Sequence, residues 1–255
     1  MLTESQKERY ARHLILEGIG SEGQEKLLAG RVLVIGAGGL GSPVLFYLVA
    51  AGVGRVGIVD GDCVELSNLQ RQIIHTTPAI GIPKVASAAR ALGALNPDAS
   101  LVTHPLRVTA ENIMELIDGY DFVIDATDNF ETKFLINDAC VLAGKSYSHG
   151  GILRYKGQTT TITPGITACY RCIFPEAPES DVALACSRAG VLGVLPGVIG
   201  TIQATEAIKF IVGEGGLLAG RLLTYDSHAM KFREVTLRRN PRCPVCGESP
   251  TITTL

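Results

Sequence analysis

The chain has 255 residues, of which 46% are hydrophobic, and a formal net charge of −2 at pH 7. This length allows one large α/β domain, or a nucleotide-binding part with a smaller appendage, and the apolar content suffices for a sizeable core. The near-neutral charge argues against nucleic acid as a partner, and the polar residues 1–9 lack a secretory signal, so we expect a cytoplasmic protein.

The first 150 residues alternate between short apolar runs that predict strands and patterns that predict helices. The expected strands are residues 32–35, 55–59, 101–104, 122–125 and 146–149. The expected helices lie around residues 40–51, 85–95, 110–117 and 132–143. This alternation is typical of a Rossmann-like, mostly parallel sheet, in which the carboxyl ends of the strands carry the binding site.

A glycine-rich turn, Gly36-Ala37-Gly38-Gly39-Leu40-Gly41, follows the first expected strand, and Asp60 follows the second. Glycines let a phosphate approach the backbone, and such an acid can bind a ribose, so a nicotinamide-dependent oxidoreductase is one interpretation. The chain adds Asn68, Arg71 and Lys84 near the same strand ends. Cationic groups that neutralise a polyphosphate favour an ATP site instead.

After residue 150 the hydrophobic pattern changes. Residues 158–163, 221–225 and 232–237 read as strands, which we expect to extend the sheet antiparallel and to carry a partner surface. Residues 174–181 predict a mobile loop.

The most apolar stretch, residues 189–202, is the one candidate for a membrane span. Pro196 interrupts it, and Gln203, Glu206 and Lys209 follow soon after. A span needs roughly 18 or more uninterrupted apolar residues, so we expect a buried helix at an internal or subunit contact and no membrane association.

Four of the seven cysteines form two pairs with a spacing typical of metal ligands, Cys169 with Cys172 and Cys243 with Cys246. Two such pairs predict one closed, structural zinc site that clips the C-terminal segment to the body. A redox couple, or reduced thiols without a role, are the alternatives.

The remaining cysteines receive separate interpretations. Cys140 lies in a helical apolar pattern and is expected in the core, whereas Cys63 has no evident role. Cys186 lies beyond the expected mobile loop and close to Arg188, where positive charge would favour its thiolate. Two histidines, His75 and His149, are expected to make structural hydrogen bonds.

Several motifs occur together and in order along the chain. They are Arg9-Tyr10-Ala11-Arg12, the glycine turn, the block from Asp60 through Ser67-Asn68-Leu69-Gln70-Arg71-Gln72, Lys84, Asp125-Ala126-Thr127-Asp128-Asn129 and both cysteine pairs. Over essentially the whole chain, this combination resembles the bacterial ThiF/MoeB/HesA family of adenylyltransferases, relatives of the ubiquitin-activating enzymes. The resemblance implies a single ThiF-type adenylation domain over residues 1–255, with a nucleotide-binding part at about 1–150 and a carrier-binding and zinc part at about 151–255.

The resemblance also implies a reaction. The C-terminal glycine of a ubiquitin-like sulfur carrier protein, which ends in Gly-Gly, attacks the α-phosphate of Mg-ATP and gives an acyl-adenylate and pyrophosphate for thiamine, molybdopterin or related sulfur transfer. A separate cysteine desulfurase or sulfurtransferase would donate the sulfur. The alternatives are a ThiF-like enzyme that adenylates a small molecule or a tRNA base, and a non-catalytic nucleotide-binding zinc protein.

The matched positions imply roles for individual residues. Asp60 would bind the ribose, Arg71 and Lys84 would stabilise phosphate charge, and Asp128 would bind Mg²⁺ while Asp125 supports the strand end. The rest of the expected ATP site is Gly38, Gly39, Gly41, Ser67, Asn68 and Asn129.

Two further catalytic roles come from the same resemblance. Arg12 would reach into the neighbouring subunit of a homodimer as an arginine finger. Cys186 matches the loop cysteine with which some relatives form a covalent bond to the carrier.

Overall fold

The computed structural model describes residues 1–177 and 189–255, and in them the strands form one eight-stranded sheet of order β3-β2-β1-β4-β5-β6-β7-β8. Five strands run parallel: β1 (Arg31–Ile35), β2 (Arg55–Val59), β3 (Ser100–His104), β4 (Phe122–Asp125) and β5 (Tyr147–Leu153). The other three are antiparallel: β6 (Lys156–Ile162), β7 (Arg221–Asp226) and β8 (Lys231–Thr236). The prediction of a mostly parallel sheet extended by antiparallel strands is confirmed.

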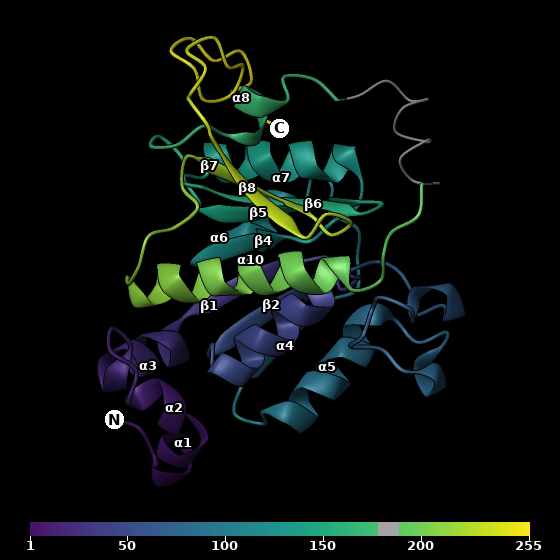
Figure 1. The fold of residues 1–255 in the computed structure, drawn as a ribbon, viewed down its shortest axis with the longest axis vertical. Coiled ribbons are helices and arrows are strands. Elements are labelled where there is room, and N and C mark those ends of the chain that lie inside the picture. Colours follow the sequence, from purple (N-terminus) through teal and green to yellow (C-terminus); the bar gives the residue numbers. More distant parts are fainter. Residues whose placement is uncertain (178–188) are drawn as a thin grey trace.

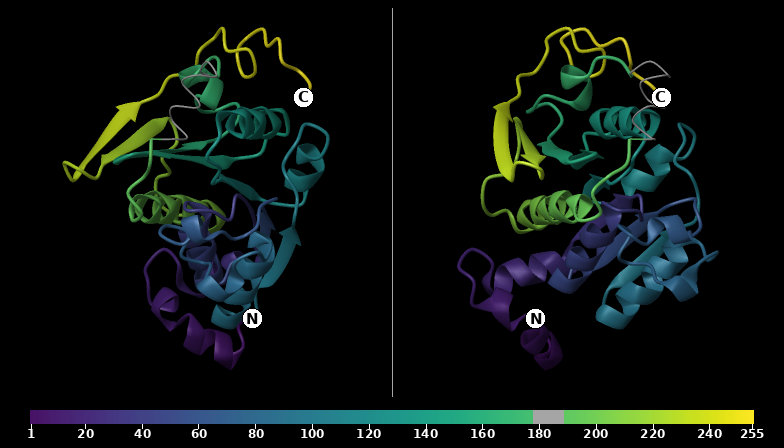
Figure 2. Two further views of the ribbon diagram at one scale, coloured as in Figure 1. Left: turned by 90° about the vertical axis from the view of Figure 1, so that its right-hand side faces the viewer. Right: turned by 45° about the vertical axis from the view of Figure 1, so that its right-hand side comes forward.

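Helices cover both faces of this sheet (Figures 1 and 2). One face carries α3 (Gly20–Ala29), α4 (Gly41–Ala51), α5 (Lys84–Leu95) and α10 (Leu195–Val212), and the other carries α6 (Ile113–Asp118), α7 (Phe130–Leu142) and α8 (Tyr170–Ile173). Successive residues of β1 alternate between the two cores, with Val32 and Val34 on one side and Leu33 and Ile35 on the other. A strand buried on both faces reads as a continuous apolar run, which is why the sequence predicts it well.

The shorter elements lie at the periphery. They are α1 (Glu4–Arg9), α2 (Ala11–Leu14), and the 3₁₀ turns η1 (Leu66–Asn68) and η2 (Thr77–Ala79). In Figure 1 the N-terminal helices lie at the end of the molecule opposite the C-terminal segment.

The apolar helix α10 differs from the expected one over residues 189–202. Pro196 stands in its first turn, where a missing N–H costs little, so the proline begins the helix rather than interrupting it. By length and composition α10 could cross a membrane, which corrects the expectation that this segment is too short. Half of it is buried, and it packs on α4 and β5, with Gly200 so close to Leu40 O that a Cβ would lie 2.6 Å away. The expected internal packing is confirmed.

Candidate active site and metal centre

The centre of the sheet contains a topological switch point, where open α/β sheets bind ligands. β1 and β4 are neighbours, and their carboxyl ends bring the glycine turn beside the segment that follows Asp125. The contact is close, because a Cβ on Gly36 would lie 2.6 Å from Ala126 O. The structure therefore places the glycine turn beside the start of the segment after β4, and nucleotide binding there stays a prediction.

The glycines of the turn differ in what they do. Gly36 has a φ of +105°, and a Cβ on Gly41 would lie 1.9 Å from Gly36 O, so both are required by the backbone itself. A Cβ on Gly38 would meet only the Gln72 amide, at 3.5 Å, so Gly38 has room for a ligand beside it. At the start of α4 the Ser42 N–H already donates to Gly38 O at 2.9 Å and Pro43 has no N–H, so the Gly41 N–H is the helix-end donor left without a partner among the described residues.

Asp60 fastens the glycine turn to the end of β2. Its Oδ2 accepts from the Ala37 N–H at 2.9 Å, and its Oδ1 accepts from the Asp62 N–H at 2.9 Å. Each carboxylate oxygen has a second lone pair, so the group can still accept from ribose hydroxyls. The ribose contact stays a prediction.

Asp125 is fully buried and supports the end of β4, as expected. The Lys133 ammonium lies 3.0 Å and His149 Nδ1 2.8 Å from its Oδ2, and the Thr127 hydroxyl donates to Oδ1 at 2.6 Å. Burial alone would raise the pKa of Asp125, but Lys133 and His149 hold it far below its usual range. Both carboxylate oxygens of Asp125 are thus occupied by groups of the protein, whereas Asp128 is exposed and can contact a ligand.

Asn129 accepts from the Thr132 N–H at 2.8 Å and caps α7. This use of its oxygen leaves its amide N–H groups for a nucleotide, so the predicted ATP contact stays untested.

The polar block after β2 folds as a turn. A backbone hydrogen bond of 3.1 Å joins Arg71 N to Asn68 O, as expected for residues three apart on one helical turn. Asn68 Oδ1 accepts from the Glu65 N–H at 3.2 Å, and Arg71 Nη1 donates to Ser67 O at 3.2 Å. These bonds hold the block in shape beside the glycine turn.

Lys84 is the first residue of α5, and its side chain is only 9% exposed. Its ammonium lies 3.2 Å from Asp62 Oδ2, and Arg107 pairs with the other oxygen of Asp62 at 3.0 Å. Burial would raise the pKa of Asp62, but Lys84 and Arg107 together lower it. Lys84 is therefore a fixed cation and not a solvated surface charge.

A pocket of about 430 Å³ lies between Arg71 and the start of α10. Of the described residues that line it, Arg71 alone is charged; the others are Pro43, Gln70, Ile73, Leu192, Gly193, Val194 and Gly197. Two of these lining residues, Ile73 and Val194, are 60% and 69% exposed. Arg71 thus lies between the glycine turn, where a Cβ on Gly39 would be 3.5 Å from its Cγ, and an apolar surface.

The other two predicted catalytic residues are Arg12 and Cys186. Arg12 is exposed on α2 and forms no hydrogen bond or ion pair with the described residues of its own chain. Cys186 lies outside the described residues, as do residues 178–181 of the expected mobile loop.

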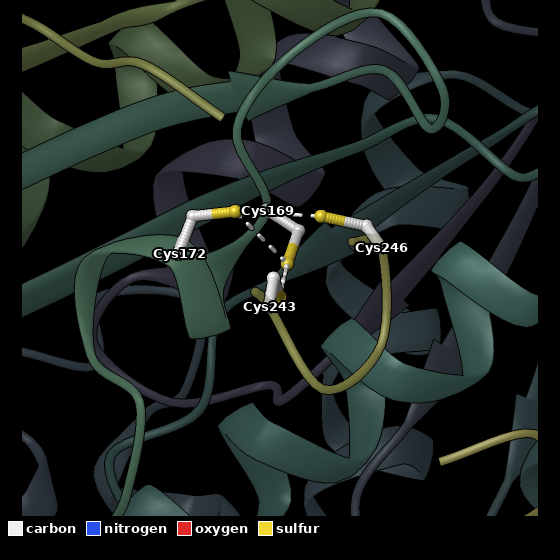
Figure 3. Close-up of side chains that lie close together, drawn as sticks. All are labelled: Cys169, Cys172, Cys243 and Cys246. Atoms are coloured by element: carbon white, nitrogen blue, oxygen red, sulfur yellow. Dashed lines mark hydrogen bonds between the residues drawn. The ribbon is translucent and has the colours of Figure 1, made fainter. Parts of the chain in front are cut away.

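The four paired cysteines come together as predicted (Figure 3). Their sulfur atoms all lie within 4.8 Å of one another, and the Cys169–Cys243 and Cys172–Cys246 distances are 3.5 and 3.3 Å. Sulfurs about 2.3 Å from one tetrahedral Zn²⁺ would lie about 3.8 Å apart, so the cluster fits that ion. The Asn240 N–H donates to Cys172 Sγ at 3.3 Å, and the hydrogen bond from Cys169 lowers the pKa of Cys172 while that of Cys169 is raised. Cys172 is thus the sulfur that most readily becomes a thiolate, the form that binds metals.

The other cysteines of the described segments are Cys63 and Cys140, both free. Cys140 is buried, and burial raises the pKa of its thiol beyond the usual range, which agrees with the expected core position. Cys63 is exposed.

Three polar residues beside the glycine turn and the end of β4 have no catalytic prediction from sequence. His75 bonds the carbonyl of Ala37, Lys133 pairs with Asp125, and Gln203 on α10 donates to Asp125 O at 2.9 Å. His75 lies three residues after Gln72 and Lys133 lies eight residues after Asp125, so both are close to recognisable motifs in sequence. Their hydrogen-bond and ion partners, however, are determined by the tertiary packing. Gln203 has no local signal beyond a polar side chain in an apolar helix.

Comparisons of the sequence and of the structure with known proteins find related proteins. Residues 10–245 match the ThiF family. The chain is 50% identical over 254 residues to a sulfur carrier protein adenylyltransferase of Thermus thermophilus, covering 98% of this chain and 94% of that one. It is 51% identical over 247 residues to the SAMP-activating enzyme E1 of Haloferax volcanii, covering 97% and 91%. Among solved structures, E. coli MccB with ATP superposes with a TM-score of 0.85 at 25% identity, over 96% of this chain and 75% of that one.

Proposed function

The chain belongs to the ThiF family, and from this premise we propose that it is an ATP-dependent adenylyltransferase for the C-terminal glycine of a ubiquitin-like sulfur carrier protein. The observation that supports the proposal is the meeting of the β1 and β4 ends, where the glycine turn packs against Ala126, in the segment that leads to the exposed Asp128. The relatives named above are an adenylyltransferase and an E1, which are 50% and 51% identical to this chain over 94% and 91% of their own lengths.

The reaction needs little proton chemistry from the protein. The carboxylate of the carrier is already ionised near neutral pH, so it can attack the α-phosphate without a general base. Negative charge builds on the phosphate oxygens and on the departing pyrophosphate. The task of the side chains is therefore to supply fixed positive charge at those atoms.

Lys84 and Arg71 are suited to that task for different reasons. Lys84 is buried and already oriented by Asp62, so it loses little freedom when a phosphate arrives. Arg71 is held at Ser67 O and presents a planar group that can bind two phosphate oxygens. Asp128 would hold Mg²⁺, which neutralises phosphate charge when bound.

The four-cysteine cluster would hold Zn²⁺ as a structural ion. A closed set of four sulfurs leaves no open position for a substrate. The cluster joins α8 to residues 243–246, and Arg239 adds bonds to Gly165 O and Cys246 O at 2.8 and 2.6 Å. The ion would therefore fix the C-terminal segment to the sheet.

A homodimer is the proposed assembly. The exposed side chains of Ile73 and Val194 line the same pocket as Arg71, and large exposed apolar groups of this kind favour a protein contact. A second subunit at this surface would approach the glycine turn, where its Arg12 could act as the finger.

The carrier would dock on the antiparallel end of the sheet. All six residues of β8 are exposed, and Figure 2 shows β7 and β8 at the edge of the molecule, away from α4 and α5. Phe232 stacks on Tyr225 with ring centroids 4.4 Å apart, and Val235 is 49% exposed. An edge strand with apolar side chains can pair with another strand. The sulfur would come from a separate donor, and we place the reaction in the cytoplasm.

ATP–pyrophosphate exchange tests this proposal. Purified protein is incubated with a thiamine-pathway carrier or a molybdopterin-pathway carrier, each with an intact or a truncated Gly-Gly end. Exchange that needs one intact carrier is the expected result and identifies the pathway. Protection by NAD but not by ATP in thermal unfolding would favour an oxidoreductase, and ATP binding without exchange would favour another acceptor or a non-catalytic protein.

A further inference from the structure

His75 is a buried residue between η1 and η2, and both nitrogens of its ring have hydrogen-bond partners. Nε2 lies 2.9 Å from Ala37 O, and Nδ1 lies 2.9 Å from Ser87 Oγ. His75 and Ser87 are 5% and 6% exposed, and Ala37 is completely buried. The expected structural role is thus confirmed, and the two partners show which segments His75 holds together.

These partners determine the tautomer of the ring. A carbonyl oxygen can only accept, so Nε2 carries the proton, and in the neutral ring Nδ1 accepts from the Ser87 hydroxyl. Burial lowers the pKa of His75, and the Lys84 charge adds to this effect. The neutral ring therefore satisfies both neighbours with one proton.

The same two partners belong to the two segments that carry the proposed phosphate contacts. Ala37 lies in the glycine turn, and its N–H is held by Asp60 at 2.9 Å while its carbonyl is held by His75. Ser87 lies on α5, three residues and nearly one helical turn after Lys84. A single imidazole therefore spans the gap between the turn and the helix of the fixed cation.

We propose that His75 is a positioning residue for adenylation, which sets the distance between the glycine turn and Lys84. This inference rests on the proposed function, because the distance matters only if both segments contact one triphosphate. His75 contacts no substrate in this arrangement and acts through Ala37 and Ser87. A shift of about 1 Å between groups that act on one substrate can cost about 100-fold in rate.

Four variants separate positioning from general stability. His75→Leu removes both bonds, Ser87→Ala removes one, and His75→Gln keeps a donor near the Nε2 position for Ala37 O. The matched control is Tyr147→Phe, which deletes a buried bond of 3.0 Å to Asn137 on the opposite face of the sheet. Each variant is characterised by its Tm, its KM for ATP, its KM for the carrier and its kcat.

The expected result is a split between the two substrates. His75→Leu raises the KM for ATP about tenfold and lowers kcat, with the KM for the carrier unchanged, because a lost hydrogen bond loosens only the nucleotide site. His75→Gln restores most of the ATP affinity, and Ser87→Ala raises the KM for ATP about threefold. Tyr147→Phe lowers Tm without changing either KM.

Three outcomes would overturn the positioning role of His75. An unchanged KM for ATP in His75→Leu, or in Ser87→Ala if the leucine variant does not fold, overturns the positioning role while leaving the proposed function intact. Equal changes in both KM values, or the same kinetic loss in Tyr147→Phe, reduce His75 to a stability role and also overturn it. A wild-type protein that neither binds ATP nor supports exchange overturns both proposals together.

Discussion

The replacement Lys84→Met tests the electrostatic account most sharply, because the structure separates its effect on activity from its effect on stability. Methionine fills the space of the aliphatic stem but removes the charge. The partner Asp62 is 50% exposed and keeps Arg107 at 3.0 Å, so the change leaves no buried charge unpaired. We expect the free energy of unfolding to change by at most about 1 kcal/mol.

The effect on turnover should be much larger. A preorganised group at the developing charge contributes about 3 kcal/mol, which corresponds to a loss of about 100-fold or more in kcat. The assay is ATP–pyrophosphate exchange at saturating carrier, combined with urea unfolding of the same preparations.

The matched control is Arg107→Met, which removes the other ion partner of Asp62 at a position 83% exposed. We expect it to retain normal exchange. A Lys84→Met protein within about threefold of wild type, or an equal loss in Arg107→Met, would contradict the claim that Lys84 is a fixed phosphate-binding cation.

Three further results are expected. A mixture of Arg12→Ala and Asp128→Ala subunits should regain part of the activity after subunit exchange, since one site of the heterodimer has both residues intact; if every mixture stays inactive, the finger does not act between subunits. Cys172→Ser should lose bound zinc, measured by elemental analysis, and lower Tm, whereas Cys63→Ser, at an exposed cysteine outside the cluster, should change neither; equal metal content in both would exclude the cluster as the site. The pKa of the Asp125 carboxyl is held below its unfolded value of about 3.9, so its contribution to stability is present above that pH and is lost as the pH falls below it. Asp125→Asn should therefore weaken the loss of unfolding free energy at acid pH, measured by urea unfolding. An unchanged decrease of the unfolding free energy at acid pH would contradict this assignment.

The central parallel strands β1, β2 and β4 were predictable because burial on both faces requires apolar residues in sequence. Residues 32–35 of β1 are all buried, and an unbroken apolar run of this kind can be recognised locally. The cysteine pairs were predictable for a similar reason, since their spacing alone matches the geometry of one ion.

The N-terminal helices were not predictable in the same way. α3 buries only Gly23, Gln24 and Leu27, so it has no wide apolar stripe, and α1 depends on a capping box at Thr3 rather than on packing. The predicted extent of α10 was wrong because the sequence alone does not distinguish a proline in the first turn of a helix from a proline in its middle.

The predicted site residues converge only in part within one chain. The glycine turn, Asp60 and the segment after β4 meet because parallel strands end on one side of the sheet. The fixing of Lys84 by Asp62, and of Ala37 by His75, depends on side chains that meet across turns, which no local pattern encodes. The arginine finger depends on a second subunit.

The central claim is adenylation of a carrier terminus, and the most direct measurement is the intact mass of the carrier after incubation with Mg-ATP and enzyme, quenched in acid to preserve the acyl phosphate. The account predicts a carrier mass increased by one AMP unit with wild-type enzyme. It also predicts a yield at least tenfold lower with Arg71→Ala, in a protein with unchanged Tm. An unmodified carrier with ATP still bound to the enzyme, or full modification by Arg71→Ala, would contradict it.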